Sequence, residues 1–230
     1  MTPPTVDRIR ERHERLLAHL RAVAERNGHD PDRLRIVGIT KTWPAEVARA
    51  ALEAGIGRLG ESRIQEAEPK VAAVPEAEWH FVGRLQANKA RRAVRAFAAI
   101  HSVDSLDLLA RLRELAAEEG REPLLLLQVN VTGEAAKAGL SREEALAPGT
   151  VAAVRRGGVV GLMTIAPMGA AEADARRAFG DLRRLRERLA AAAGVALPEL
   201  SMGMSADAEA AAAEGATLVR IGTALFGPRT

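Results

Sequence analysis

Cysteine and tyrosine are both absent from this chain of 230 residues, and its aromatic side chains are limited to four phenylalanines and two tryptophans. Without cysteine, the chain can form no disulfide, no thiolate metal site and no cysteine nucleophile. This composition fits a reducing compartment, and we expect a cytoplasmic protein. Because aromatic rings are so few, a surface that binds nucleic acid by base stacking is not expected.

Long apolar runs are also missing. The first twelve residues are charged and contain no apolar signal-peptide region. No run of about 18 apolar residues is present, so no membrane-spanning helix is expected. The formal net charge is only +3, with 47% hydrophobic and 27% charged residues, which is a globular composition without a basic tail. The length fits a single domain over residues 1–230.

Lysine is scarce as well, since only four of the 33 basic residues are lysine. Arginine stays charged, whereas a desolvated lysine can lose its proton and form a Schiff base. Lys41 ends a short, partly β-branched apolar run at 34–41, which predicts a buried parallel strand. Active-site residues of a parallel barrel lie at the carboxyl ends of its strands, so Lys41 is the candidate reactive lysine. A strand-end lysine that reaches solvent is the alternative. The other three lysines are less suitable as reactive residues. Lys70 lies in a helical segment, Lys89 among arginines and Lys137 in a glycine-bearing loop.

Strand and helix patterns alternate along the chain, after an amphipathic helix that starts near residue 6 and ends near 27–28. Eight strands are predicted, and each except the last is followed by a helix. This number and order of elements are those of a (β/α)8 TIM barrel, an α/β fold. A flavodoxin-like or Rossmann sheet is the alternative. Asp104 is predicted to cap the helix after the fourth strand. The predicted strands are 34–41, 56–60, 79–83, 97–103, 123–131, 159–165, 197–202 and 217–221.

Two late segments have the features of an anion site. Residues 201–205 lead into a helix, and Ser205 is predicted as its N-cap, where backbone N–H groups and a hydroxyl can bind an anion. After the eighth strand, Gly222 allows close backbone approach to a ligand, and Thr223 offers a hydroxyl and an amide. A phosphate cradle after strands seven and eight recurs in this fold. A capping serine and a turn glycine without a ligand are the alternative.

A lysine at the end of the first strand and a phosphate cradle after the last two strands are together the features of a site for pyridoxal 5'-phosphate, whose aldehyde condenses with lysine. Arg220 lies between these features in the sequence. An arginine that faces the pyridine nitrogen cannot accept its proton and keeps the ring neutral, which weakens the ring as an electron sink. A surface or interface arginine is the alternative. His80 and Met163 fall near predicted strand ends, where each either lines the mouth or packs in the wall.

Six segments carry a resemblance to a known family: ITKT (39–42), GESRIQE (60–66), WHFVGRLQANK (79–89), GLMTI (161–165), SMGMS (201–205) and VRIGTALFG (219–227). The chain resembles the YggS/PROSC family of pyridoxal phosphate homeostasis proteins from about residue 6 to residue 228. The resemblance implies an alanine racemase-like barrel of PLP fold type III. One departure is Ser62, where the family commonly has asparagine. This departure leaves open whether a polar side chain at the end of the second strand contacts the cofactor ring.

The resemblance also implies roles for individual residues. Lys41 would carry the cofactor as a Schiff base, and Arg220 would lie against the pyridine nitrogen. The implied phosphate contacts and their close neighbours are Ser201, Met204, Ser205, Gly222 and Thr223.

The family resemblance implies intracellular buffering or delivery of pyridoxal phosphate without established turnover. PLP-dependent apo-enzymes are the expected recipients, and we expect a monomer with no nucleic-acid or membrane partner. Related racemases use a tyrosine and a second β domain, and related decarboxylases use a cysteine, none of which is expected here. A weak racemase or related enzyme with Lys41 as its sole base is the alternative. Nucleic-acid binding through Lys89, Arg91, Arg92 and Arg95 is a third interpretation, against which a solvated helix face is favoured.

Overall fold

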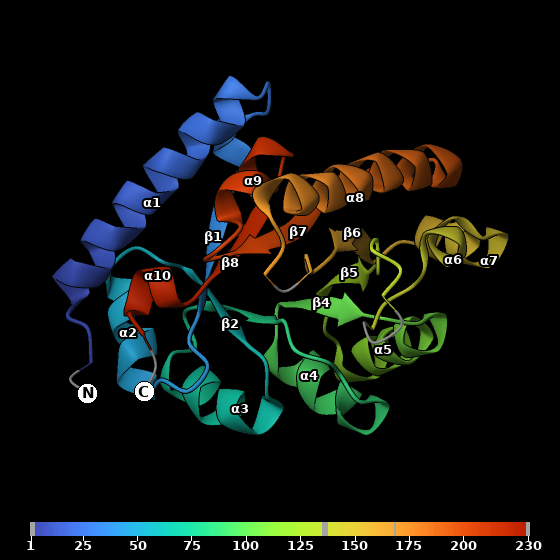
Figure 1. Ribbon diagram of the computed structural model, residues 1–230. Helices are drawn as coiled ribbons and strands as arrows, with labels where there is room; N and C mark the ends of the chain where they lie inside the picture. Colours follow the sequence, from blue (N-terminus) through green and yellow to red (C-terminus); the bar gives the residue numbers. More distant parts are fainter. Residues whose placement is uncertain (1–2, 135–137, 168, 229–230) are drawn as a thin grey trace.

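The computed structural model describes residues 3–134, 138–167 and 169–228, so Lys137 lies outside the described residues. Eight parallel strands close into one barrel in sequence order, with β8 paired to β1 (Figure 1). The predicted TIM barrel is therefore confirmed, and the open-sheet alternative is wrong. The strands are β1 (Arg35–Ile39), β2 (Arg58–Glu61), β3 (Glu78–Phe81), β4 (Ala99–Val103), β5 (Leu124–Gln128), β6 (Val159–Met163), β7 (Glu199–Met204) and β8 (Leu218–Ile221).

Helices surround the barrel, and α1 lies across its outside against α2, α9 and α10 (Figure 1). None of the helices in the described ranges is long and apolar enough to cross a bilayer. The α-helices are α1 (Val6–Arg26), α2 (Ala45–Glu53), α3 (Ile64–Ala73), α4 (Ala90–Ala96), α5 (Leu106–Glu119), α6 (Arg142–Leu146), α7 (Pro148–Arg155), α8 (Glu172–Ala193), α9 (Ala208–Ala213) and α10 (Thr223–Phe226). Two short 3-10 helices are η1 (Pro31–Arg33) and η2 (Ala87–Lys89).

The first helix forms where the sequence predicts it. The Thr5 hydroxyl accepts a hydrogen bond from the Arg8 N–H, and the helix ends at Asn27. Ile9, Leu20 and Val23 are buried on one face, at spacings that belong to a helical stripe. The expected extra N-terminal helix is thus confirmed, and its apolar face packs on the helical layer.

The barrel has an inner and an outer apolar layer because side chains alternate along each strand. Gly60 makes the inner layer possible, since a Cβ at this position would lie 2.5 Å from the Ile39 Cδ1 atom. The strands are otherwise covered by helices on the outside, which explains their nearly continuous apolar sequence. The inner apolar cluster consists of Val37, Ile39, Leu126, Met163 and Leu218.

Two predicted helix caps are wrong. The cap of α5 is Ser105, whose hydroxyl accepts the Leu108 N–H, and not Asp104. The helix after β7 begins at Ala208 with Asp207 at its N-cap position, and not at Ser205. A turn intervenes, in which Asp207 Oδ1 accepts the Met204 N–H at 2.5 Å. This turn leaves Ser205 on the rim of the barrel instead of inside a helix start.

The basic face of α4 is neutralised by acidic neighbours. Arg91 and Arg95 both pair with Glu119, and Arg92 pairs with Glu68. These surface ion pairs connect α4 to α5 and α3. Their pairing agrees with a solvated helix face and gives no support to a nucleic-acid interface.

Candidate functional site

The three strand ends that carry the predicted site are neighbours. Strand β8 pairs with β1 on one side and with β7 on the other. Lys41 follows β1 by two residues, Gly222 directly follows β8, and Ser205 directly follows β7. Because parallel strands end at the same rim, these residues lie on one arc of the barrel mouth.

Lys41 leaves the strand toward the mouth. The preceding residue, Thr40, is fully buried and its hydroxyl donates to Glu61 Oε1 at 2.7 Å, on the side covered by α3. Lys41 itself lies in the turn that follows β1, on the backbone between Thr40 and Thr42. Its side chain is half-buried there.

The predicted cradle joins two loops. The Ser205 hydroxyl accepts a hydrogen bond from the Ala224 N–H at 3.4 Å, which connects the loop after β7 to the start of α10. Ser205 and Thr223 are exposed, whereas Gly222 between the strand and α10 is buried. Met204 is 42% exposed on the same rim. Hydroxyl and amide donors at the rim suit an anionic group.

Arg220 lies beneath this cradle and is only 5% exposed, so the alternative of a surface arginine is wrong. Its Nη1 donates to Ser201 Oγ at 2.6 Å, and its Nη2 donates to the Thr164 carbonyl at 2.9 Å. Both acceptors are neutral. Burial lowers the pKa of Arg220 to about 10, with Asp207 acting in the opposite direction. Within the described ranges no carboxylate bonds this guanidinium, which is a costly arrangement unless a ligand compensates it.

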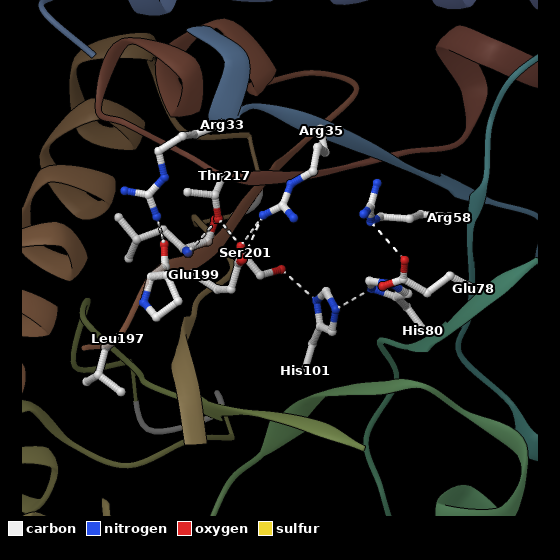
Figure 2. Close-up of polar contacts among 12 residues, drawn as sticks. Arg33, Arg35, Arg58, Glu78, His80, His101, Leu197, Glu199, Ser201 and Thr217 are labelled. Carbon is white, nitrogen blue, oxygen red and sulfur yellow. Dashed lines mark hydrogen bonds and ion pairs between the residues drawn. The ribbon is translucent and has the colours of Figure 1, made fainter. Parts of the chain in front are cut away.

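A chain of polar groups continues from Arg220 across the barrel, and Figure 2 shows its members from Ser201 to Glu78. Ser201 Oγ lies 2.7 Å from His101 Nδ1, and His101 Nε2 lies 2.8 Å from His80 Nδ1. His80 Nε2 lies 3.0 Å from Glu78 Oε1 at the opposite end of the barrel. Ser201, His80 and His101 are each at most 1% exposed, so this chain crosses the interior without solvent.

One assignment of protons satisfies every bond of the chain. The bond with His80 lowers the pKa of Glu78, so its carboxylate is ionised and can only accept, here from His80 Nε2–H. His80 Nδ1 then accepts from His101 Nε2–H, and His101 Nδ1 accepts the Ser201 hydroxyl proton. Burial moves the pKa of His101 well below its usual value, which agrees with this neutral tautomer. The Ser201 oxygen remains as the acceptor for Arg220.

Ser201 therefore lies behind Arg220 and contacts the mouth only through it. His80 and Met163 are wall residues, since each is 1% exposed. The sequence analysis did not single out His101. Its signal is a histidine in the middle of an otherwise apolar strand, at a position of the strand that faces inward.

Two hollows lie at other parts of the barrel mouth. The larger, of about 700 Å³, lies beside the mouth among the loops after β2, β3 and β4, and Ser62 is one of its lining residues. The smaller, of about 230 Å³, lies at the ends of β3, β5 and β6 and is lined by Thr164 and Gln128. Neither hollow includes Lys41 or Ser205 in its lining. The predicted site is therefore described by its donors on the rim, of which Ser205 and Thr223 are exposed.

Known proteins share both the sequence and the architecture of this chain. The family model for the N-terminal domain of alanine racemase matches residues 14–230. The pyridoxal phosphate homeostasis protein of Synechocystis is 42% identical over 203 residues, which cover 86% of this chain and 93% of that protein. The protein of the same name from Aquifex aeolicus is 40% identical, over 95% of this chain and 97% of that protein. This chain belongs to the pyridoxal phosphate homeostasis protein family.

Solved structures agree with this membership. PipY of Synechococcus elongatus, solved with PLP bound, is 38% identical and superposes with a TM-score of 0.81, over 95% of this chain and 100% of that chain. Alanine racemase from Corynebacterium glutamicum has a TM-score of 0.70 at 18% identity, over 98% of this chain and 61% of that chain, which shows a shared fold. The resemblance on which the sequence analysis depended is confirmed.

Proposed function

We propose that the chain binds pyridoxal 5'-phosphate at the barrel mouth and holds it for release. The adjacency of β7, β8 and β1 carries this proposal, because it brings a strand-end lysine to one arc with two hydroxyls and backbone N–H donors. The donor set fits the ligand. A primary amine suits the aldehyde, neutral donors on the rim suit the phosphate, and a buried uncompensated guanidinium suits an acceptor on the ring. PipY, at 38% identity, has been solved with PLP bound.

Each residue has a distinct part in the proposal. Lys41 would hold the aldehyde end of the ligand through its amine, and Ser205, Gly222 and Thr223 would hold the phosphate. Arg220 donates toward the ring nitrogen. It has no capacity to accept a proton, so the ring stays neutral. Bound pyridoxal phosphate stabilises negative charge on a neighbouring carbon, and a neutral ring supplies less of that stabilisation.

Ser201 and Met204 are the two remaining residues of the predicted site. Ser201 acts through Arg220, because its hydroxyl is already engaged with that guanidinium and with His101. Met204 lies exposed next to Ser205, where its side chain can cover one edge of the ligand. Cytoplasmic location, a monomeric state and transfer to PLP-dependent apo-enzymes belong to this proposal as predictions.

A carrier is favoured over an enzyme by the rim itself. Met204, Ser205 and Thr223 are exposed, so water reaches the cradle and the ligand can leave it. The relatives above are named for homeostasis and not for a reaction. The second candidate is a weak racemase with Lys41 as its sole base, favoured by the fold shared with alanine racemase.

The direct test is an absorbance titration of the purified protein with pyridoxal 5'-phosphate. We expect a visible band and a borohydride-fixed adduct on Lys41, both absent from Lys41→Ala. Lys89→Ala is the matched control and should retain both. A fixed adduct that persists in Lys41→Ala would place the attachment elsewhere and defeat the proposal.

A further inference from the structure

A second lysine lies behind Lys41 and is buried. Lys70 on α3 has a side chain only 5% exposed, and its Nζ donates to Glu61 Oε1 at 2.6 Å. The same Nζ donates to the Thr40 carbonyl at 2.8 Å. That carbonyl belongs to the peptide unit that joins Thr40 to Lys41. A buried ammonium group therefore holds the backbone on the N-terminal side of the candidate reactive lysine.

The backbone on the other side of Lys41 is held by the same helix. The N–H of Thr42 donates to Glu66 Oε1. Glu66 and Lys70 are four residues apart, on one face of α3, and form an ion pair at 3.4 Å. Both peptide units that flank Lys41 are consequently tied to one turn of one helix.

The backbone between these two ties is strained. Thr42 has a φ of +69°, and within the described ranges it is the one residue other than glycine with a positive φ. A β-branched side chain is an outlier in this region, and such outliers persist only where surrounding contacts enforce them. The contacts made by Lys70 and Glu66 adjoin this residue, together with the bond from the Trp43 N–H to the Thr40 carbonyl at 3.0 Å that closes the turn.

Stability alone gives a poor account of the cluster. Glu61 is fully buried, its Oε2 has no hydrogen-bond partner, and burial raises its pKa despite the bonds from Lys70 and Thr40. Removing two charges from water costs more than a buried pair commonly returns, and apolar replacements of such pairs are often neutral or stabilising. Unsatisfied buried groups and strained backbone gather at functional sites.

We propose that Lys70, together with Glu61 and Glu66, positions Lys41 for attachment of the aldehyde ligand. The inference rests on the proposed function. Lys70 touches neither the ligand nor the reacting atoms in this account. It fixes the peptide units on which the Lys41 side chain is mounted, so that the amine points over the mouth before the ligand arrives. Misplacing a reacting group by about 1 Å is enough to slow a reaction by about 100-fold.

The decisive variant replaces the charged pair by apolar side chains of similar length. Glu61→Met/Lys70→Met removes the tie to the Thr40 carbonyl without leaving a lone buried charge. We expect the thermal midpoint of the ligand-free double variant to stay close to that of the unaltered protein, because removal of two buried charges offsets the loss of the acceptor for the Thr40 hydroxyl. Attachment of pyridoxal 5'-phosphate, followed by visible absorbance, is expected to be at least about tenfold slower. Lys89→Met, the same substitution at a lysine outside the cluster, should change neither quantity.

A second pair of variants covers the case in which the double variant fails to fold. Glu66 is partly exposed, so Glu66→Ala should fold but lose the acceptor for the Thr42 N–H, with slower attachment. Glu66→Gln retains an acceptor oxygen and should restore most of the rate. Normal attachment rates in the folded double variant, or in Glu66→Ala, would overturn the positioning role. An unaltered protein that forms no adduct at all would instead overturn the proposed function, so the two failures are distinguishable.

Discussion

Arg220 donates a hydrogen bond to the hydroxyl of Ser201 at 2.6 Å, inside the barrel and below the predicted phosphate cradle. Ser201 also bonds His101, and in the proton assignment given above its hydroxyl is the donor, so the guanidinium is the last member of a chain that begins at Glu78. Two buried acceptors, Ser201 Oγ and the Thr164 carbonyl, bind the two Nη atoms of Arg220. The orientation of Arg220 is therefore set by buried groups that lie away from the mouth.

The first prediction concerns this link. Ser201→Ala leaves one donor of Arg220 and the Nδ1 atom of His101 without partners. Leaving buried groups unsatisfied should lower the free energy of unfolding by about 1–3 kcal/mol, measured by urea denaturation. Binding of pyridoxal 5'-phosphate should weaken as well. Ser205→Ala, at an exposed serine, should stay within about 0.5 kcal/mol of the unaltered stability. Equal stability of Ser201→Ala and the unaltered protein would contradict the chain.

The second prediction concerns the loss of folding stability at acidic pH. Burial moves the pKa of His101 well below 6.5, so the unfolded chain takes up a proton near pH 6.5 while the folded protein does not. The stabilising contribution is complete above pH 6.5 and is lost as the pH falls toward the folded pKa. The loss per histidine is about 1.4 kcal/mol for each pH unit.

The measurement is urea denaturation at pH values from 7.5 down to 5.5. His101→Asn should reduce the acid dependence by about one proton, although some dependence remains because burial also lowers the pKa of His13. An unchanged acid dependence in a folded His101→Asn variant would show that His101 is not the buried neutral group described above.

The third prediction concerns the phosphate. Gly222→Val places a β-branched side chain where the backbone should approach the ligand, and we expect binding to weaken by about 10- to 100-fold. Gly57→Val is the matched control, since no atom lies within 4 Å of a Cβ built at that exposed glycine. Pyridoxal, which lacks the phosphate, should bind the unaltered protein with a similar loss. Equal affinities for pyridoxal and its phosphate, measured by absorbance titration, would exclude the cradle.

Much of the fold could be predicted from sequence because it depends on local periodicity. Eight apolar runs separated by helical stripes specify the barrel, and strand order then brings Lys41 beside Gly222 without knowledge of any side-chain contact. The family motifs added residue roles, which remain predictions for this chain.

The buried polar clusters could not be predicted, because they form between segments far apart in the chain. His101 and Ser201 are in contact although they are 100 residues apart in the sequence, and the local pattern of neither strand predicts the contact. The sequence analysis favoured Lys41 over Lys70 because Lys70 lies in a helical segment and not at the end of a strand. Its spacing from Ile64 and Ala67, two buried residues of α3, was the available signal that it lies on the inner face of its helix.

The last prediction is that the protein binds pyridoxal phosphate but turns over no amino acid at an enzyme-like rate. The sequence contains no tyrosine and no cysteine, so a second acid or base opposite Lys41 would have to come from another residue type. Racemisation needs proton transfer on two faces of the substrate carbon, and one lysine serves one face. Arg220 adds to this argument, because a ring whose nitrogen faces a guanidinium remains neutral and withdraws fewer electrons.

The exposed rim is a further reason to expect no enzyme-like turnover. Met204, Ser205 and Thr223 leave the cradle open to water, which weakens the electrostatic stabilisation of charge that develops during a reaction. The test is incubation of the loaded protein with L- and D-amino acids in deuterated water, with the α-proton followed by NMR. We expect exchange no faster than with free pyridoxal phosphate. Exchange or racemisation near about 1 per second, at the low end of ordinary enzyme rates, would favour the racemase with Lys41 as its base over the carrier.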